Sequence, residues 1–300
     1  VTLLTEAHGM ESEEGEKLVT FQLETAMNGA PNVRRIRSSS AAGISIVWVE
    51  FDWDTDIYRA RQIVSERIPA VREKLPQGIG EPTMAPISSI MGEVMLLGVR
   101  SDSLSPMELR TLADWTIRPQ LKALGGIANV IVIGGEYKQY QVLANPNRMK
   151  HYGISLEELQ QAVEAANVNT TGGFYNEFGN QYNIKGEGRA YDVDDLQEAL
   201  IKEVNDQPIR ISDVTQVKIG AADKIGDGSL NASPAVIMTI TKQPDVNTLE
   251  LTGRMEEALT KMNETLPESV EIKSHIFRQA DFINASINNL QQTSIYIITI

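Results

Sequence analysis

The 300-residue chain contains no cysteine, which excludes disulfide bonds, thiolate metal sites and cysteine nucleophiles. It has only three histidines, and none lies at metal-ligand spacing from another. His275 shares its strand face with Glu271 and Lys273, which is typical of a solvated sheet edge. No catalytic triad can be proposed, because that would need a histidine positioned between a serine and an acid. The glycine pairs at 125–126 and 134–135 lack the spacing of a phosphate-binding loop. We therefore predict that the chain is not an enzyme and uses no cofactor.

A cluster of basic residues is also missing. The chain carries 27 lysines and arginines against 40 aspartates and glutamates, a formal net charge of -13. This balance argues against nucleic acid and anionic lipid as partners, and it is compatible with cations, although acidic surfaces usually serve solubility alone. The length and the 42% hydrophobic content are sufficient for a globular protein of about two domains.

Long hydrophobic runs are absent. The mostly apolar residues 295–300 fall far short of the roughly 20 residues that a membrane helix needs. They fit either a buried terminal strand or the beginning of a membrane helix. The polar, amphipathic residues Gln279–Gln292 before them favour the helix, so we predict that residues 279–300 begin a truncated transmembrane helix.

The first 90 residues are expected to form one α+β unit. Apolar residues alternate with polar ones in Ser45–Trp53, as in a strand, and then recur at helical spacing from Ile57 to Leu75. Asp54 and Thr55 are candidate N-caps of this helix. The whole unit has the order strand, helix, strand, strand, helix at Thr2–Glu6, Ser12–Met27, Val33–Ser38, Ser45–Trp53 and Ile57–Leu75.

A second unit is divided by an insertion. Two strand-helix-strand patterns lie far apart, at Gly92–Val99, Ser105–Leu124 and Ile127–Ile133, and at Ala235–Thr241, Leu251–Leu266 and Val270–Phe277. We predict that these halves, residues 91–136 and 232–278, close into one ferredoxin-like split βαβ unit. The strands at 127–133 and 235–241 should then belong to one sheet.

Residues 137–231, between the halves, are predicted to be an inserted α+β domain. They include a strand at Tyr140–Ala144, a short helix capped by Ser155, and a glycine- and asparagine-rich stretch at 167–188. That stretch carries three aromatic residues close together, Phe174, Tyr175 and Phe178. Such a connection fits either a self-contained surface hairpin or a protruding arm that packs its rings elsewhere.

Five segments, in this order, resemble the first large periplasmic loop of resistance-nodulation-division (RND) efflux pumps. They are Glu16–Asn28 (EKLVTFQLETAMN) with Val33–Ser38 (VRRIRS), Thr55–Ile68 (TDIYRARQIVSERI), Asp114–Leu121 (DWTIRPQL), Gly125–Gly135 (GGIANVIVIGG) and Tyr140–Gly153 (YQVLANPNRMKHYG). None of them is a catalytic motif, but together they are more specific than any single motif. The second and third resemble the heavy-metal branch more than the drug-efflux branch.

The resemblance implies a first porter subdomain at 1–90, a second porter subdomain at 91–136 and 232–278, a docking subdomain at 137–231, and the start of a membrane helix at 279–300. It further implies an inner-membrane homotrimer driven by proton influx, with this region in the periplasm. Its implied partners are a periplasmic adaptor protein and an outer-membrane channel. Its implied substrate is a metal cation, either monovalent Cu or Ag or divalent Zn, Co, Cd or Ni.

The ten methionines are the candidate ligands for a soft cation, because thioethers suit Cu(I) and Ag(I). Most of them, such as Met255 and Met262 on a helix stripe, are explained by core packing. A strand period of two, however, places Met91, Glu93 and Met95 on one face. A carboxylate between two thioethers on an apolar face is unusual.

In the resembled family this strand lines the substrate cleft, and Met238 falls near the same wall. Arg37 matches a position that is basic and faces the cleft in heavy-metal pumps. We therefore expect Met91, Glu93, Met95 and Met238 to line a metal pathway beside Arg37. The alternatives are an edge carboxylate in water for Glu93 and apolar packing for the methionines. By the same resemblance, the family's main methionine cluster and its proton-relaying acids lie outside this sequence.

Two other functions compete with metal export. A drug or lipophile exporter of the same architecture would favour an aromatic-lined cleft, whereas aromatic residues make up only 6% of this chain. A soluble sensor or binding module could also be built of repeated ferredoxin-like units. The presence or absence of a dozen hydrophobic spans in the natural gene would separate these possibilities.

Overall fold

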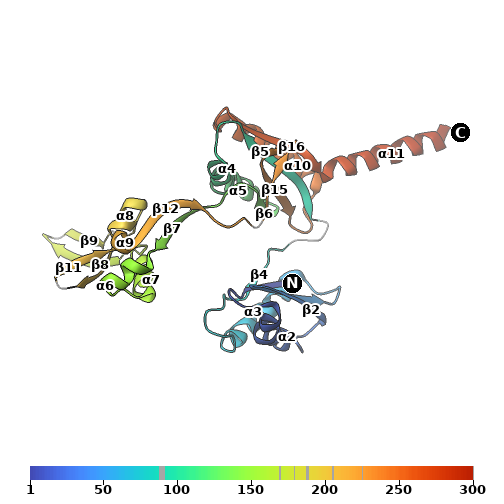
Figure 1. Cartoon of the computed structure of the whole chain (residues 1–300). Helices are drawn as coiled ribbons and strands as arrows, with labels where there is room; N and C mark the ends of the chain where they lie inside the picture. Colours follow the sequence, from blue (N-terminus) through green and yellow to red (C-terminus); the bar gives the residue numbers. More distant parts are fainter. Residues whose placement is uncertain are drawn as a thin grey trace.

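The computed structural model of the chain describes residues 1–87, 92–168, 170–178, 180–186, 189–204, 206–224 and 226–299. Figure 1 shows three bodies and a long C-terminal helix that extends away from them. Each body has its own cluster of buried apolar side chains. The predicted mixed α+β class is confirmed.

The first body is an antiparallel sheet of four strands in the order β2-β3-β1-β4. Its elements are β1 (Thr2–Glu6), α1 (Ser12–Gly15), the π-helical turn η1 (Glu16–Thr20), α2 (Phe21–Met27), β2 (Val33–Ala41), β3 (Ile44–Phe51), α3 (Ile57–Arg72) and β4 (Thr83–Met84). Leu3, Val47 and Val49 from the sheet and Val64 from α3 are fully buried together. The alternating strand positions and the helix stripe therefore meet in one core.

Two details before α3 differ from the sequence-based expectation. The N-cap is Asp56, whose Oδ1 accepts a hydrogen bond of 2.9 Å from the backbone N–H of Arg59, and it is neither Asp54 nor Thr55. Strand β3 ends at Phe51, and Trp53 is 92% exposed. The reason is a turn that leaves the sheet, in which the N–H of Thr55 donates to the carbonyl of Asp52 at 3.0 Å.

The second body repeats this topology with strands far apart in the sequence. Its elements are β5 (Glu93–Ser101), α4 (Pro106–Leu112), the π-helical turn η2 (Ala113–Ile117), α5 (Arg118–Lys122), β6 (Ile127–Ile133), β15 (Val236–Lys242), α10 (Thr248–Thr265) and β16 (Val270–Arg278). The strand order is β16-β5-β15-β6. Because β15 pairs with β6, with Ile237 opposite Ile133, the prediction that these two strands share a sheet is confirmed.

The helix before β6 continues through Pro119 and ends at Lys122. A proline inside an α-helix removes one hydrogen bond and clashes with the carbonyl four residues earlier. Here Pro119 lies in the first turn of α5, directly after the wider π-helical turn η2, which accommodates its ring. The first helix of the first body contains a π-helical turn in the corresponding place.

The insertion leaves the second body along two paired strands, β7 (Lys138–Ala144) and β12 (Thr215–Ala221), which run side by side in Figure 1. Its other elements are α6 (Pro146–Tyr152), α7 (Leu156–Ala165), β8 (Thr170–Glu177), β9 (Asn180–Gly186), α8 (Val193–Glu198), β10 (Leu200–Val204), β11 (Gln207–Arg210) and α9 (Ile211–Val214). Ser155 caps α7 as predicted, because its Oγ accepts from the N–H of Glu158 at 3.1 Å. A short pair, β13 (Ser229–Leu230) and β14 (Ser233–Pro234), follows before β15.

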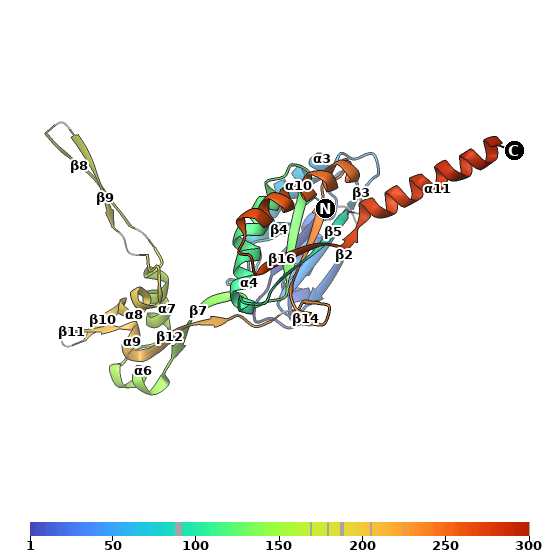
Figure 2. The same ribbon diagram turned by 90° about the horizontal axis from the view of Figure 1, so that it is seen from above.

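The glycine-rich stretch forms the β8–β9 hairpin, which projects from the insertion in Figure 2. Phe174 is 62% exposed and Phe178 is 94% exposed. These rings are not buried within the hairpin, which agrees with a protruding arm better than with a self-contained one.

Helix α11 (Gln279–Thr299) projects from the second body in both views. Its start is held by Arg278, whose Nη2 lies 2.9 Å from Oδ1 of Asp281. Among the helices of the described residues, none combines the length and the apolar character required to cross a membrane.

Candidate functional site

The methionines proposed to line a metal pathway belong to the core of the second body. Met95 and Met238 are fully buried, in one cluster with apolar residues of α4, α5 and α10. Met238 lies opposite Leu97 in the sheet, so it shares the face that these helices cover. Met91 lies outside the described residues. The apolar-packing alternative therefore holds for Met95 and Met238 in this structure.

Glu93 does not share their face. The pairing of β5 with β15 shifts from Met95 opposite Ile240 to Glu93 opposite Thr241, so two residues advance on β5 against one on β15. Directly opposed residues lie on the same side of a sheet, and Ile240 and Thr241 are neighbours on opposite sides. This β-bulge turns Glu93 to the side away from Met95, and leaves it exposed. The shared face expected from a strict period of two is wrong for this reason.

Within the part of the chain that the structure describes, no group of three or more histidine, aspartate or glutamate side chains is arranged to hold a metal ion. His275 is exposed on β16, where the ammonium of Lys273 lies 3.3 Å from Glu271. The solvated sheet edge expected there is confirmed.

Arg37 lies on the open face of the first sheet, where its partner is Glu50. The Nε of Arg37 donates to Oε1 of Glu50 at 2.9 Å, and Nε and Nη2 of Arg35 donate to Oε2 at 3.0 and 2.8 Å. Trp48, which is opposite Arg37 in the register, is 37% exposed beside this network. Arg37 thus binds a carboxylate of its own sheet, Glu50, which no pattern in the sequence singled out.

The electrostatics of this network follow from two guanidinium groups sharing one carboxylate. The hydrogen bonds from Arg35, and then those from Arg37, lower the pKa of Glu50 below its ordinary value. The three charges leave an excess of one positive charge on this face. A bare cation is repelled there unless Glu50 is released, which makes the network a barrier to a cation and not a ligand set.

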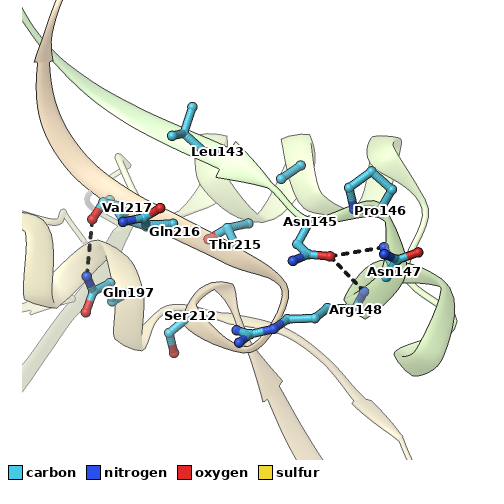
Figure 3. A pocket seen from close by; sticks show the side chains of 11 residues that line it. Leu143, Asn145, Pro146, Asn147, Arg148, Gln197, Ser212, Thr215, Gln216 and Val217 are labelled. Carbon is cyan, nitrogen blue, oxygen red and sulfur yellow. Dashed lines mark hydrogen bonds between the residues drawn. The ribbon is translucent and has the colours of Figure 1, made fainter.

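The insertion contains a polar hollow of about 700 Å³ between β7, α6, α8, α9 and β12 (Figure 3). Asn145 lies at its rim, and its Oδ1 accepts from the N–H groups of Asn147 and Arg148 at 3.1 and 3.2 Å. The side chain of Arg148 extends across the hollow toward Ser212. The lining includes this one cation and no carboxylate, so it suits an anionic or neutral polar group and not a metal ion.

Comparison with known proteins places this geometry in a family. The family model described as AcrB/AcrD/AcrF matches residues 1–300. The chain belongs to this family. The RND membership predicted from the sequence is confirmed, and with it the prediction that the chain is not an enzyme.

Three relatives are similar over most of this chain. Protein HelA of Legionella pneumophila is 34% identical over 97% of this chain, and the cation efflux system protein CzcA of Alcaligenes sp. is 31% identical over 100%. The cation efflux system protein CusA of Escherichia coli K12 is 31% identical over 92%. The chain spans 28%, 29% and 26% of their respective lengths, less than a third in each case.

A crystal structure of a heavy metal efflux pump is similar in three dimensions. It superimposes with a TM-score of 0.87 at 25% sequence identity and covers 97% of this chain and 29% of that chain. The likeness therefore includes all three bodies and not only a common small fold.

Proposed function

We propose that this chain is the periplasmic portion of a proton-driven RND pump in the inner membrane that exports metal cations across the cell envelope. The observation that carries the proposal is the similarity, over nearly the whole chain, to a crystal structure of a heavy metal efflux pump. Two of the relatives, CzcA and CusA, are named cation efflux system proteins, which also supports export of a metal cation. Family membership removes the support for a soluble sensor module.

Within this pump, residues 1–90 would be the first porter subdomain and residues 91–136 with 232–278 the second, both ferredoxin-like. Residues 137–231 would be the docking subdomain, and residues 279–300 would lead into a membrane helix. The pairing of β6 with β15 and the three separate apolar clusters support this division. The exposed Phe174 and Phe178 of the β8–β9 hairpin and the polar hollow beside Arg148 support a docking role for the insertion, in contact with other subunits of a homotrimer, an adaptor protein and an outer-membrane channel.

For the cation itself, the open sheet faces are the surfaces that can line a cleft. Glu93 is exposed on one of them and can attract a cation, whereas the Arg35–Glu50–Arg37 network on the other repels it. Met95 and Met238 are both buried and need not contact the substrate. We therefore propose that this portion guides a cation by charge and leaves thioether coordination to other parts of the pump.

The test is growth of cells that lack their own metal exporters and carry the full-length gene. Tolerance to Cu, Ag, Zn, Cd, Co and Ni is compared with tolerance to dyes and detergents, with an empty vector as control. Increased tolerance to at least one metal, without increased tolerance to lipophilic compounds, is the expected result. Tolerance to lipophilic compounds alone would replace metal export by the drug-exporting alternative.

A further inference from the structure

Helices α4 and α5 lie near the point where β7 leaves the second body (Figure 1). Residues of both helices, of η2 and of the start of β7 line a groove that the proposed function does not use. It consists of two adjoining hollows of about 350 and 580 Å³, which both include Asp114, Trp115 and Tyr137 in their lining. We call it the Trp115 groove.

The floor of the Trp115 groove is a fixed network of charges. The side chain of Asp114 is only 9% exposed, and its Oδ2 accepts from Nε of Arg110 at 2.6 Å while its Oδ1 lies 3.5 Å from Nη1 of Arg118. Arg110 also donates to the carbonyl of Gly134 at 2.8 Å, and its guanidinium lies 5.9 Å from the ring centroid of Tyr137. These groups are held in place by contacts within the chain, which lowers the entropic cost of binding.

The walls of the groove are aromatic and exposed. Trp115 is 74% exposed, Tyr137 is 52% exposed and Tyr140, at one end, is 44% exposed. Exposed tryptophan and tyrosine beside arginine are the residue types that dominate the energetics of protein interfaces. The π-helical turn η2, which contains both Asp114 and Trp115, is a further departure from regular helix at this place, and such turns are frequent at functional sites.

The charge of the groove is opposite to that of the chain. Its lining contains four basic residues, Arg110, Arg118, Lys122 and Lys138, and a single carboxylate, Asp114, which the two arginines already neutralise. The chain as a whole has a net charge of -13. Trp115, Arg118 and Lys122 follow one another at helical spacing, so the apolar and basic groups form one continuous stripe.

We propose that the Trp115 groove binds a segment of a partner protein in which acidic residues flank one aromatic or large aliphatic side chain. The apolar side chain packs between Trp115 and Tyr137, and the carboxylates pair with Arg118 and Lys122 at one end and with Lys138 at the other. Two copies of the chain cannot pair groove to groove, because the two basic linings would repel each other; contact with another face of a second copy is an outcome of the test. The inference concerns a different surface from the cation pathway and does not depend on the export function.

The experiment uses the 300-residue chain labelled with 5-fluorotryptophan. The chain has three tryptophans, so the fluorine NMR spectrum reports on Trp115 separately, while Trp48 and Trp53 in the first body serve as internal controls. The probes are blocked peptides of sequence Asp-Glu-Phe-Glu-Asp, Asp-Glu-Ser-Glu-Asp and Lys-Arg-Phe-Arg-Lys. We expect the first to shift the Trp115 resonance saturably, and the other two to bind at least about tenfold more weakly.

Matched variants separate the groove from general charge. R118E/K122E is expected to weaken binding of the acidic phenylalanine peptide by roughly tenfold or more. W115A, followed through a fluorinated phenylalanine in the peptide, is expected to weaken it by roughly 30-fold. R34E/K74E changes the net charge equally on exposed side chains of the first body and should leave binding unchanged. Thermal melting of each variant shows that it is folded, and R118Q replaces the double variant if that one is not.

Four results would overturn the proposal. They are equal binding of the acidic and basic peptides, unchanged binding in folded R118E/K122E, displacement of the peptide by free indole at equal concentration, and a shift of Trp115 with protein concentration alone. The third would indicate a site for a small apolar molecule, and the fourth would indicate a second copy of the chain as occupant.

Discussion

Replacing Met95 and Met238 in two ways distinguishes core packing from metal ligation. Both side chains are fully buried among apolar residues of the sheet and of the helices that cover it. Leucine has almost the volume of methionine but no thioether, so a methionine-to-leucine change removes a ligand and preserves packing. Alanine removes the ligand and the packing together.

The magnitudes follow from this burial. A volume-conserving exchange such as Met95→Leu usually costs less than about 1.5 kcal/mol, whereas Met95→Ala leaves a cavity and costs about 2–5 kcal/mol. In a cooperative unit of roughly 60–100 residues, each kcal/mol lowers the melting temperature by about 4–8 °C. The alanine variants of Met95 and Met238 should therefore lose at least about 8 °C, and each leucine variant less than its alanine counterpart.

The assays are thermal melting of the 300-residue chain and metal tolerance of cells carrying the full-length gene. We expect M95L/M238L to remain folded and to keep the tolerance, and M95A or M238A to lose stability first. A leucine double variant that is folded and expressed normally, but no longer protects cells against copper or silver, would refute the reasoning. It would show that the thioethers contact the substrate in another conformation of the second body.

Four further outcomes are expected. Hydrogen bonds from two arginines lower the pKa of Glu50, so the contribution of Glu50 to stability is present above its ordinary pKa of 4.5 and is lost as the pH falls through the lowered pKa. The difference in melting temperature between wild type and E50Q should therefore be full at pH 7 and should narrow on acidification below pH 4.5. A difference that stays constant would contradict this. D56A removes the cap of α3 and should cost about 1 kcal/mol in thermal melts, whereas D54A should cost nothing comparable. In the full pump, E93A should reduce metal resistance without loss of folding, and normal resistance at unchanged expression would remove Glu93 from the pathway. Hydrogen exchange should show low protection in the β8–β9 hairpin of the isolated chain, and strong protection in a proven monomer would speak against an arm that needs a neighbour.

Hydrophobic periodicity predicted the second body well, because its elements depend on local pattern. The alternation in Ile127–Ile133 and Ala235–Thr241 and the stripe in α10 are each decided by burial on one face. The pairing of these two strands could also be predicted, because each half-unit has one open sheet edge and joining the two edges buries more surface. Where a single face and a single period decide the structure, the sequence was sufficient.

The face of Glu93 could not be predicted in the same way. A β-bulge is set by the hydrogen bonds of the neighbouring strand, and local alternation contains no information on them. One additional residue on β5 was enough to separate Glu93 from Met95. In this structure the bulge therefore places Glu93 and Met95 on different faces, whereas Met91 lies outside the described residues.

The partner of Arg37 was predictable in principle. A two-residue turn at Ala42–Gly43, with Gly43 at a φ of 79°, fixes the register of the β2–β3 hairpin. Counting outward from that turn places Arg37 opposite Trp48 and brings Glu50 next to it. The groove at Trp115 gave no such signal, because its two sides are brought together only by the tertiary fold: one comes from α4, η2 and α5, and the other from Tyr137 and the start of β7.

The equivalence of the two bodies explains where the insertion could enter. Strands β6 and β15 correspond to β2 and β3, which are joined by a turn of two residues, so the insertion takes the place of a hairpin turn. A turn at the surface is the position where additional chain disturbs the core least. The chain is tightly packed at Gly134, directly after β6: the φ of Gly134 is 87°, and an added Cβ there would lie 2.6 Å from the carbonyl oxygen of Ala235. Beyond it the chain leaves as the paired strands β7 and β12, with Lys138 opposite Ala221 and Ala144 opposite Thr215. A paired ladder resists bending more than a single strand does. The insertion is therefore attached to the second body through this paired ladder, which leads to β6 on one side and, through β13 and β14, to β15 on the other.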